Sequence, residues 1–141
     1  MFLYLTLGTN DLAAAKRFYD AVMPTLGHGL RAEYSDEVGY GPPAPARIML
    51  WITHPYDKRP ATVGNGSMPA FVAPSRAAVD AFHAAGLAAG GTDEGAPGLR
   101  PHGPHFYACY LRDPDGNKLS AVCEAPDTAC ADGVAQTGPS A

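Results

Sequence analysis

Apolar and polar residues alternate in two early stretches of the chain. The first is FLYLTLG, residues 2–8, and the second is ARIMLWITHP, residues 46–55. Side chains along a strand point alternately to opposite faces of a sheet, so this period of two is typical of a strand with one buried face. The predicted apolar faces consist of Leu3, Leu5 and Leu7 in the first stretch and Ile48, Leu50 and Ile52 in the second.

The segment between these stretches has the pattern of a helix followed by a hairpin. In TNDLAAAKRFYDAVMPTLG, residues 9–27, Asn10 or Asp11 can cap the first free amides, and Pro24 with Gly27 ends the helix. Its apolar stripe is Leu12, Ala15, Phe18 or Tyr19, and Val22. The short strand signals GLRAEYS and EVGYG then predict a hairpin between residues 27 and 43.

The chain then repeats its own pattern after a loop from Pro55 to Ser67. One constant offset lays Met68 on Tyr4, Ser75 on Asp11, Phe82 on Phe18 and Gly91 on Gly27, and HFYACYLRDPDGNKLSAV closes this second half as a hairpin. A repeated supersecondary unit predicts an α+β fold of two tandem βαβββ modules, with helices outside a cup-shaped mixed sheet. We expect a single domain, 1–125, with modules at about 2–54 and 68–125, and a flexible tail, 126–141.

Composition and charge narrow the possible partners. The chain has 141 residues, 46% of them hydrophobic, and a formal net charge of -4 with no basic cluster. A nucleic-acid partner is therefore not expected. The N-terminal stretch has neither a basic region nor a long apolar run, so we expect no membrane partner and a cytoplasmic location. Three cysteines, an odd number without metal-type spacing, favour reduced thiols.

The opening LTLGTNDLAAAKRFYD and the closing RDPDGNKLSAV, together with the tandem modules, resemble the vicinal oxygen chelate superfamily. That superfamily includes glyoxalase I, bleomycin-resistance proteins, fosfomycin-resistance thiol transferases and extradiol dioxygenases. The resemblance covers roughly residues 2–125 and implies a cup of eight strands, a homodimer and a metal held by side chains inside the cup.

The positions at which metal-dependent relatives carry their ligands can be matched one by one. The resemblance places a His or Gln of the first strand at Tyr4, a ligand of the fourth strand at Met49, a His at Met68 and a Glu at Ser120. Thioether and neutral hydroxyl groups are poor ligands for zinc, magnesium or iron(II). No cofactor is therefore predicted, and a divalent metal is possible but disfavoured.

The same positions are either part of a second core or the wall of a ligand site, because methionine fills irregular gaps and one hydrogen bond satisfies a serine. Alternation places Phe106, Ala108 and Tyr110 on the side of Ser120 and Val122, and Tyr107, Cys109, Leu111, Leu119 and Ala121 towards the helices. The inner face is expected to contain no lysine. The predicted ligand-binding residues are Tyr4, Thr6, Met49, Trp51, Met68, Arg100, Phe106, Tyr110 and Ser120.

Histidines and cysteines are the remaining candidates for chemistry. His102 and His105, in RPHGPHFY, are candidate catalytic residues with Tyr110, because a histidine at the rim of a site titrates near neutrality. A metal site on these two histidines is the less favoured hypothesis. His83 is expected to be exposed on the second helix. Cys109 and Cys123 are predicted as inert core residues rather than a redox or nucleophilic pair.

Two function classes remain open at this point. The favoured class is a glyoxalase- or bleomycin-resistance-like protein that binds an aromatic or apolar small molecule, with its usual metal site lost, and acts as a homodimer. The alternative is a glyoxalase-type lyase or thiol transferase that uses a metal or acid-base groups. Arg31, Glu33 and Arg100 are charged groups that can reach the ligand from strand edges or loops.

Overall fold

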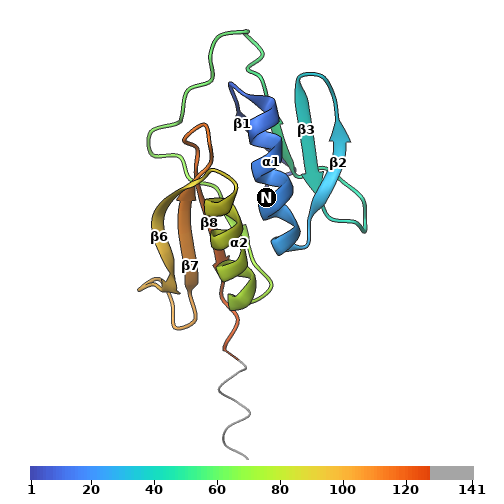
Figure 1. Ribbon diagram of the computed structural model, residues 1–141. Helices are drawn as coiled ribbons and strands as arrows, with labels where there is room; N and C mark the ends of the chain where they lie inside the picture. Colours follow the sequence, from blue (N-terminus) through green and yellow to red (C-terminus); the bar gives the residue numbers. More distant parts are fainter. Residues whose placement is uncertain (128–141) are drawn as a thin grey trace, which may run out of the picture.

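The computed structural model describes residues 1–127 and contains the βαβββ unit twice (Figure 1). The first module consists of β1 (Leu5–Gly8), α1 (Leu12–Val22), the short 3-10 helix η1 (Met23–Leu26), β2 (Gly29–Glu33), β3 (Glu37–Gly41) and β4 (Leu50–Thr53). The second consists of β5 (Ala70–Val72), α2 (Arg76–Ala88), β6 (Thr92–Leu99), β7 (Tyr107–Arg112) and β8 (Lys118–Cys123). The expected tandem modules are therefore confirmed. Most of the predicted tail and Cys130 lie outside the described residues.

Both helices follow capping residues that the sequence repeat aligns, the predicted cap Asp11 and its counterpart Ser75. The side chain of Asp11 accepts a hydrogen bond from the backbone N–H of Ala14 at 3.0 Å, and Ser75 accepts one from Ala78 at 3.1 Å. Each bond satisfies an amide that the first helical turn leaves free. Gly27, with φ of 80°, ends the first helical segment in the left-handed conformation. Neither helix, nor any other within residues 1–127, is long and apolar enough to cross a membrane.

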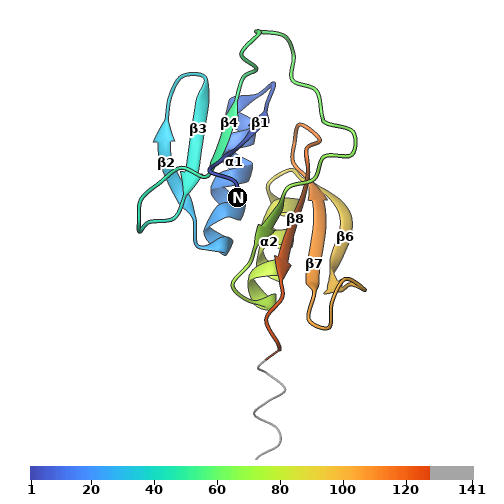
Figure 2. The same cartoon turned by 180° about the vertical axis from the view of Figure 1, so that it is seen from behind.

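The eight strands form two mixed sheets of four strands rather than one continuous sheet. Their orders are β1-β4-β3-β2 and β5-β8-β7-β6, and in each module the first strand pairs in parallel with the last. Both helices lie in front of the sheets in Figure 1 and behind them in Figure 2. The opposite side of both sheets has no helix over it. We call this side the helix-free face.

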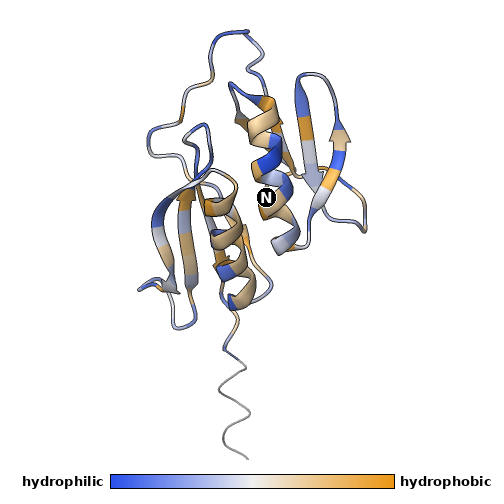
Figure 3. Ribbon diagram, in the orientation of Figure 1, coloured by the Kyte–Doolittle hydropathy of each residue, from blue (hydrophilic) through white to orange (hydrophobic). Residues whose placement is uncertain are grey.

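The two modules share one hydrophobic core, which is built around the contact between α1 and α2. Gly86 of α2 allows this contact, because a Cβ there would lie 2.6 Å from Leu111 and 3.5 Å from Phe18 and Val22. Cys109 and Cys123 are buried in the same core, as predicted, and burial raises the pKa of the Cys109 thiol. Figure 3 shows the apolar residues concentrated on the helices and on the strands behind them.

The turn Asp113–Asn117 fastens the second module to the first. Asp113 is buried, and its Oδ2 accepts a 2.7 Å hydrogen bond from the hydroxyl of Tyr19 on α1. The Asn117 amide donates to the carbonyl of Gly8 at 3.1 Å, and Asp115 accepts from the backbone N–H of Asn10 at 2.8 Å. The turn thus contacts β1, the start of α1 and its buried side. Burial raises the pKa of the Asp113 carboxyl, and the hydrogen bonds from Asn117 and Tyr19 oppose that shift.

One expectation about α2 was wrong. His83 is buried rather than exposed, and its Nε2 lies 2.8 Å from Oδ1 of Asp93 on β6. The histidine therefore joins the helix to the strand that follows it. Its hydrogen bond is the main cause that lowers the pKa of Asp93.

Candidate functional site

Strand alternation separates the core side chains from those on the helix-free face. Val38, Leu50 and Ile52 are buried in the core, as are Cys109, Leu111, Leu119 and Ala121 of the second module. The predicted helix-facing residues of β7 and β8 are thus confirmed in place. The alternate residues face the other way. Of the predicted ligand-binding residues, those within the strands are Thr6, Trp51, Tyr110 and Ser120, and those just before a strand are Tyr4, Met49, Met68 and Phe106. The predicted place of Ile48 on the core face with Leu50 and Ile52 was wrong, because Ile48 packs with Trp51 against Gly39 and strict alternation does not extend to the residues before β4.

On the first module, Trp51 of β4 packs against a glycine on the neighbouring strand. Gly39 of β3 pairs with Trp51 across the sheet, and a Cβ at Gly39 would lie 2.9 Å from the indole ring and 2.9 Å from Ile48. Tyr34 stacks on the same indole, with ring centroids 6.4 Å apart and planes at 26°. Aromatic rings packed over a cross-strand glycine keep a fixed orientation. Trp51 and the exposed Tyr34 therefore give the first module a flat apolar surface.

Tyr110 of β7 repeats this arrangement on the second module. It pairs with Gly95 of β6, where a Cβ would lie 2.9 Å from the tyrosine ring. The guanidinium carbon of Arg100 lies 5.3 Å from the ring centroid, and the ammonium nitrogen of Lys118 lies 5.9 Å from it. Both distances are typical of cation–π contacts.

The expectation that the inner face has no lysine was therefore wrong. Lys118 precedes Ser120 by two residues on β8, so alternation places both on one face. Its ammonium group over Tyr110 confirms that position. Sequence alternation contained this signal, because Lys118 falls on the same side as Ser120 and Val122. Tyr34 was also missed, since it lies beyond β2 where no strand period extends.

Ser120 occupies the centre of β8 between Ala70 and Tyr110, its partners on the two neighbouring strands. Its side chain has no exposed surface, and its Oγ has no hydrogen-bond partner in the structure. The strand register makes Trp51, rather than Met49, its counterpart in the first module, because Thr6 pairs with Trp51 as Ala70 pairs with Ser120.

The side chains at the four positions that the resemblance assigns to metal ligands do not fit a divalent metal. Tyr4 is 54% exposed, Met49 and Met68 are partly exposed thioethers, and the Ser120 hydroxyl is buried. Zinc, magnesium and iron(II) favour carboxylate, imidazole or thiolate donors, none of which is present at these positions. Within residues 1–127, no group of three or more His, Cys, Asp or Glu side chains is arranged to hold a metal.

The candidate histidines lie in the connection between β6 and β7. His102 contacts the ring of Phe106 edge-on, with centroids 5.1 Å apart, and His105 is half-buried. Arg100 comes from the start of the same connection, but its side chain turns back to donate to the carbonyl of Ala96 and to lie over Tyr110. The structure thus brings Arg100 to Tyr110 and leaves the role of His102 and His105 as a prediction. Arg31 is exposed and donates to the carbonyl of Gly41.

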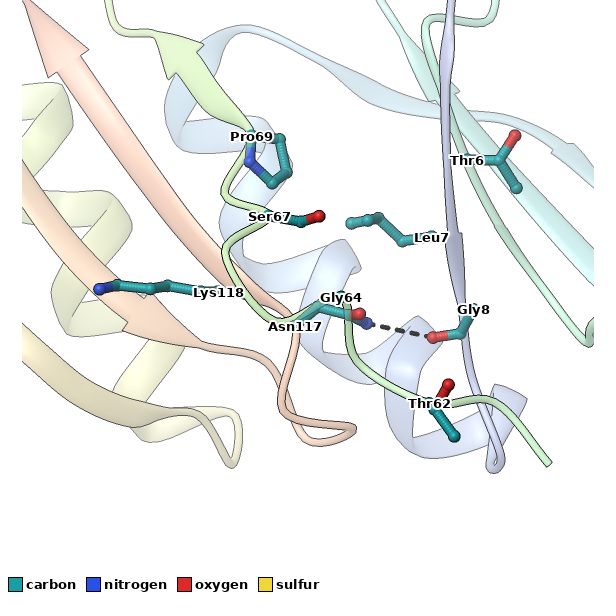
Figure 4. Close-up of a pocket in the computed structure, with 9 residues that line it drawn as sticks. All are labelled: Thr6, Leu7, Gly8, Thr62, Gly64, Ser67, Pro69, Asn117 and Lys118. Carbon is teal, nitrogen blue, oxygen red and sulfur yellow. Dashed lines mark hydrogen bonds between the residues drawn. The ribbon is translucent and has the colours of Figure 1, made fainter.

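A pocket of about 210 Å³ lies between β1 and the end of the second sheet, under the linker that joins the modules. Its lining includes Thr6 and Lys118, but Figure 4 shows both side chains directed away from its centre, and those of Leu7 and Ser67 directed towards each other. The pocket therefore lies between the two modules. It does not gather the predicted ligand-binding side chains.

Comparisons with known proteins agree on the family. The sequence-family model of the Glyoxalase/Bleomycin resistance protein/Dioxygenase superfamily matches residues 2–120. A glyoxalase/bleomycin resistance protein from Albidiferax ferrireducens T118 is 45% identical, with a TM-score of 0.80, over 89% of this chain and 99% of its own.

More distant structures share the fold. A glyoxalase-related enzyme from Fulvimarina pelagi is 22% identical with a TM-score of 0.68, over 87% of each chain. A lactoylglutathione lyase from Agrobacterium tumefaciens is 24% identical with a TM-score of 0.60, over 87% of this chain and 92% of its own. No curated protein matches the chain. On the family model and the 45% identical structure, the chain belongs to the glyoxalase/bleomycin resistance protein/dioxygenase superfamily.

Proposed function

We propose that this chain binds a small molecule with a flat, apolar or aromatic body on its helix-free face. The observation that carries the proposal is the repeated placement of an aromatic ring over a cross-strand glycine, Trp51 on Gly39 and Tyr110 on Gly95. Aromatic side chains that are already held in place offer apolar contact area to a ligand without further loss of side-chain freedom.

The proposed binding uses no metal at the inherited ligand positions. The donor set there, one phenol, two thioethers and one hydroxyl, supports this part of the proposal. We expect nickel and zinc ions to leave the melting temperature of the wild-type protein unchanged. A double variant, Met68→His with Ser120→Glu, is expected to gain metal affinity if the two positions face a common space. A stoichiometric divalent ion in the purified wild-type protein would contradict the proposal.

The neutral fluorophore phenylnaphthylamine tests the binding surface. Its fluorescence is expected to rise on titration with the wild-type protein, and Trp51→Ala and Tyr110→Ala are each expected to weaken its binding. Tyr56→Ala is the matched control, because Tyr56 is a linker aromatic that is 99% exposed. Equal affinities for all four proteins would contradict a site on the helix-free face.

We also propose that a second copy of the chain completes the site. Tyr4, Tyr34, Met68 and Val72 are large apolar residues that are substantially exposed, and Val72 is 83% exposed. Apolar groups gathered on one face favour association. Sedimentation analysis is expected to show a dimer, and Val72→Lys is expected to shift the population towards monomer. A monomeric wild-type protein at every concentration would contradict this arrangement.

The alternative function is that of a glyoxalase-type lyase or a thiol transferase. One observation favours it: Tyr110 presents a phenol hydroxyl on the proposed ligand face, with Arg100 and Lys118 over its ring. Incubation with a glutathione hemithioacetal or an electrophile plus glutathione distinguishes the two functions. The binding proposal expects no turnover. Turnover that is lost in Tyr110→Phe would favour the enzyme.

A further inference from the structure

Two cations on the helix-free face have no acidic partner. Arg100 and Lys118 both lie over Tyr110, and neither forms an ion pair within residues 1–127. This is notable in a chain whose formal net charge is -4. Like charges on one ring repel each other, so the arrangement favours a bound anion.

The acidic residues of the neighbouring β6 strand are engaged elsewhere. Glu94 forms a 2.6 Å ion pair with Arg112, and Asp93 lies 2.8 Å from His83. Neither carboxylate is free to neutralise Arg100 or Lys118. The positive charge at Tyr110 is therefore open to a ligand.

Backbone glycines position Arg100. A Cβ at Gly98 would lie 3.2 Å from its guanidinium, and one at Gly95 would lie 3.5 Å from it. The side chain also donates to the carbonyl of Ala96, which fixes one end of the guanidinium. Arg100 is thus held close against β6, and Figure 4 shows Lys118 extending from β8 away from β1.

Ser120 supplies an independent observation at the same place. It pairs with Tyr110 across β7 and β8 and lies two residues from Lys118, so the three side chains share one face. Its fully buried Oγ has no partner in the structure. A buried hydroxyl without a partner is costly, and a polar atom of a ligand at Tyr110 would remove that cost.

We infer that Arg100, Lys118 and Tyr110 bind the acidic group of a flat organic anion, a carboxylate or a sulfonate, with Ser120 as an additional hydrogen-bonding group. This inference rests on the proposed function and narrows its ligand from an apolar molecule to an acid with an apolar body. Arg and Lys recognise such groups through charge-assisted hydrogen bonds.

Two fluorophores with nearly the same rings distinguish the contribution of ligand charge to binding from that of ligand shape. Anilinonaphthalene sulfonate carries the acidic group, and phenylnaphthylamine is its neutral counterpart. We expect the wild-type protein to bind the sulfonate more tightly. Arg100→Gln and Lys118→Gln are each expected to weaken sulfonate binding by about fivefold and to weaken binding of the neutral probe less, so that the preference for the sulfonate falls. Added salt should weaken sulfonate binding only.

The control is Arg17→Gln, which removes one exposed positive charge from α1 on the other side of the sheet. It should not alter the binding of either probe, and circular dichroism checks that every variant is folded. If the neutral probe binds and the sulfonate binds no better, or if both charge variants bind the sulfonate as the wild type does, the inference is overturned and the proposed function stands. If neither probe binds, both are overturned.

Discussion

Replacing Ser120 with alanine should make the unliganded protein more stable. The change removes one hydroxyl group, and the Cβ that packs between β5 and β7 stays in place. The hydroxyl is fully buried and has no hydrogen-bond partner among residues 1–127, so the wild-type protein bears the cost of its lost hydration. Most core truncations destabilise a protein, which makes the expected direction unusual.

The expected gain follows from the cost of an unsatisfied buried polar group, about 1–3 kcal/mol. Part of this gain is offset, because the variant loses the van der Waals contacts of one oxygen atom, which contribute about 0.5 kcal/mol. The net increase in the free energy of unfolding should therefore be about 1 kcal/mol, which corresponds to a rise of about 4 °C in the melting temperature of a domain of this size.

Urea unfolding of both proteins at the same fixed concentration measures this difference with equal contributions from subunit association. Ser75→Ala is the matched control, because the same chemical change removes a helix cap and should cost about 1 kcal/mol. A Ser120→Ala variant that is less stable than the wild type would refute this reasoning. The same variant should also bind anilinonaphthalene sulfonate less tightly if the hydroxyl contacts the ligand.

Three further predictions concern the turn and the tryptophan. Tyr19→Phe should lower the free energy of unfolding by about 1.5 kcal/mol in a denaturant titration, because it removes a buried hydrogen bond to a carboxylate. Burial raises the pKa of Asp113, so this carboxyl binds more protons in the native state than in the unfolded state at pH values between its unfolded and folded pKa. The contribution of Asp113 to the free energy of unfolding should therefore fall as the pH rises through that range. Unfolding measured over a pH series for the wild type and for Asp113→Asn checks the sign. Gly39→Ala should displace the indole of Trp51 and shift its fluorescence maximum, and an unchanged spectrum would contradict the packing described.

The elements with strong local signals could be predicted from the sequence. Asp11 and Ser75 cap their helices because their side chains satisfy amides a few residues away, a contact that sequence spacing specifies. Strand alternation correctly predicted that Cys109 and Leu111 point towards the helices. In these cases the residues that decide the structure are neighbours in the chain.

Features that depend on distant residues were not predicted. The hydrogen bond of the buried His83 requires Asp93, which follows the end of its helix and is the second residue of an irregular strand. That strand, β6, contains Gly95, Pro97 and Gly98, which weaken the usual strand signal. The stacking of Tyr34 on Trp51 and the placing of Arg100 over Tyr110 likewise require the folded register.

The turn at residues 113–117 also determines whether fragments of the protein, cut in the linker between the modules, can fold. Its contacts with Gly8, Asn10 and Tyr19 mean that the last hairpin of the chain completes the surface of the first helix. Fragments produced by cleavage in the linker would each lack half of this joint, so neither should fold alone, whereas a mixture of the two should reassemble. Because these contacts hold the modules together, changes in the length of the linker should cost little where they leave the two hydrogen bonds between Asn10 and Ala61 intact.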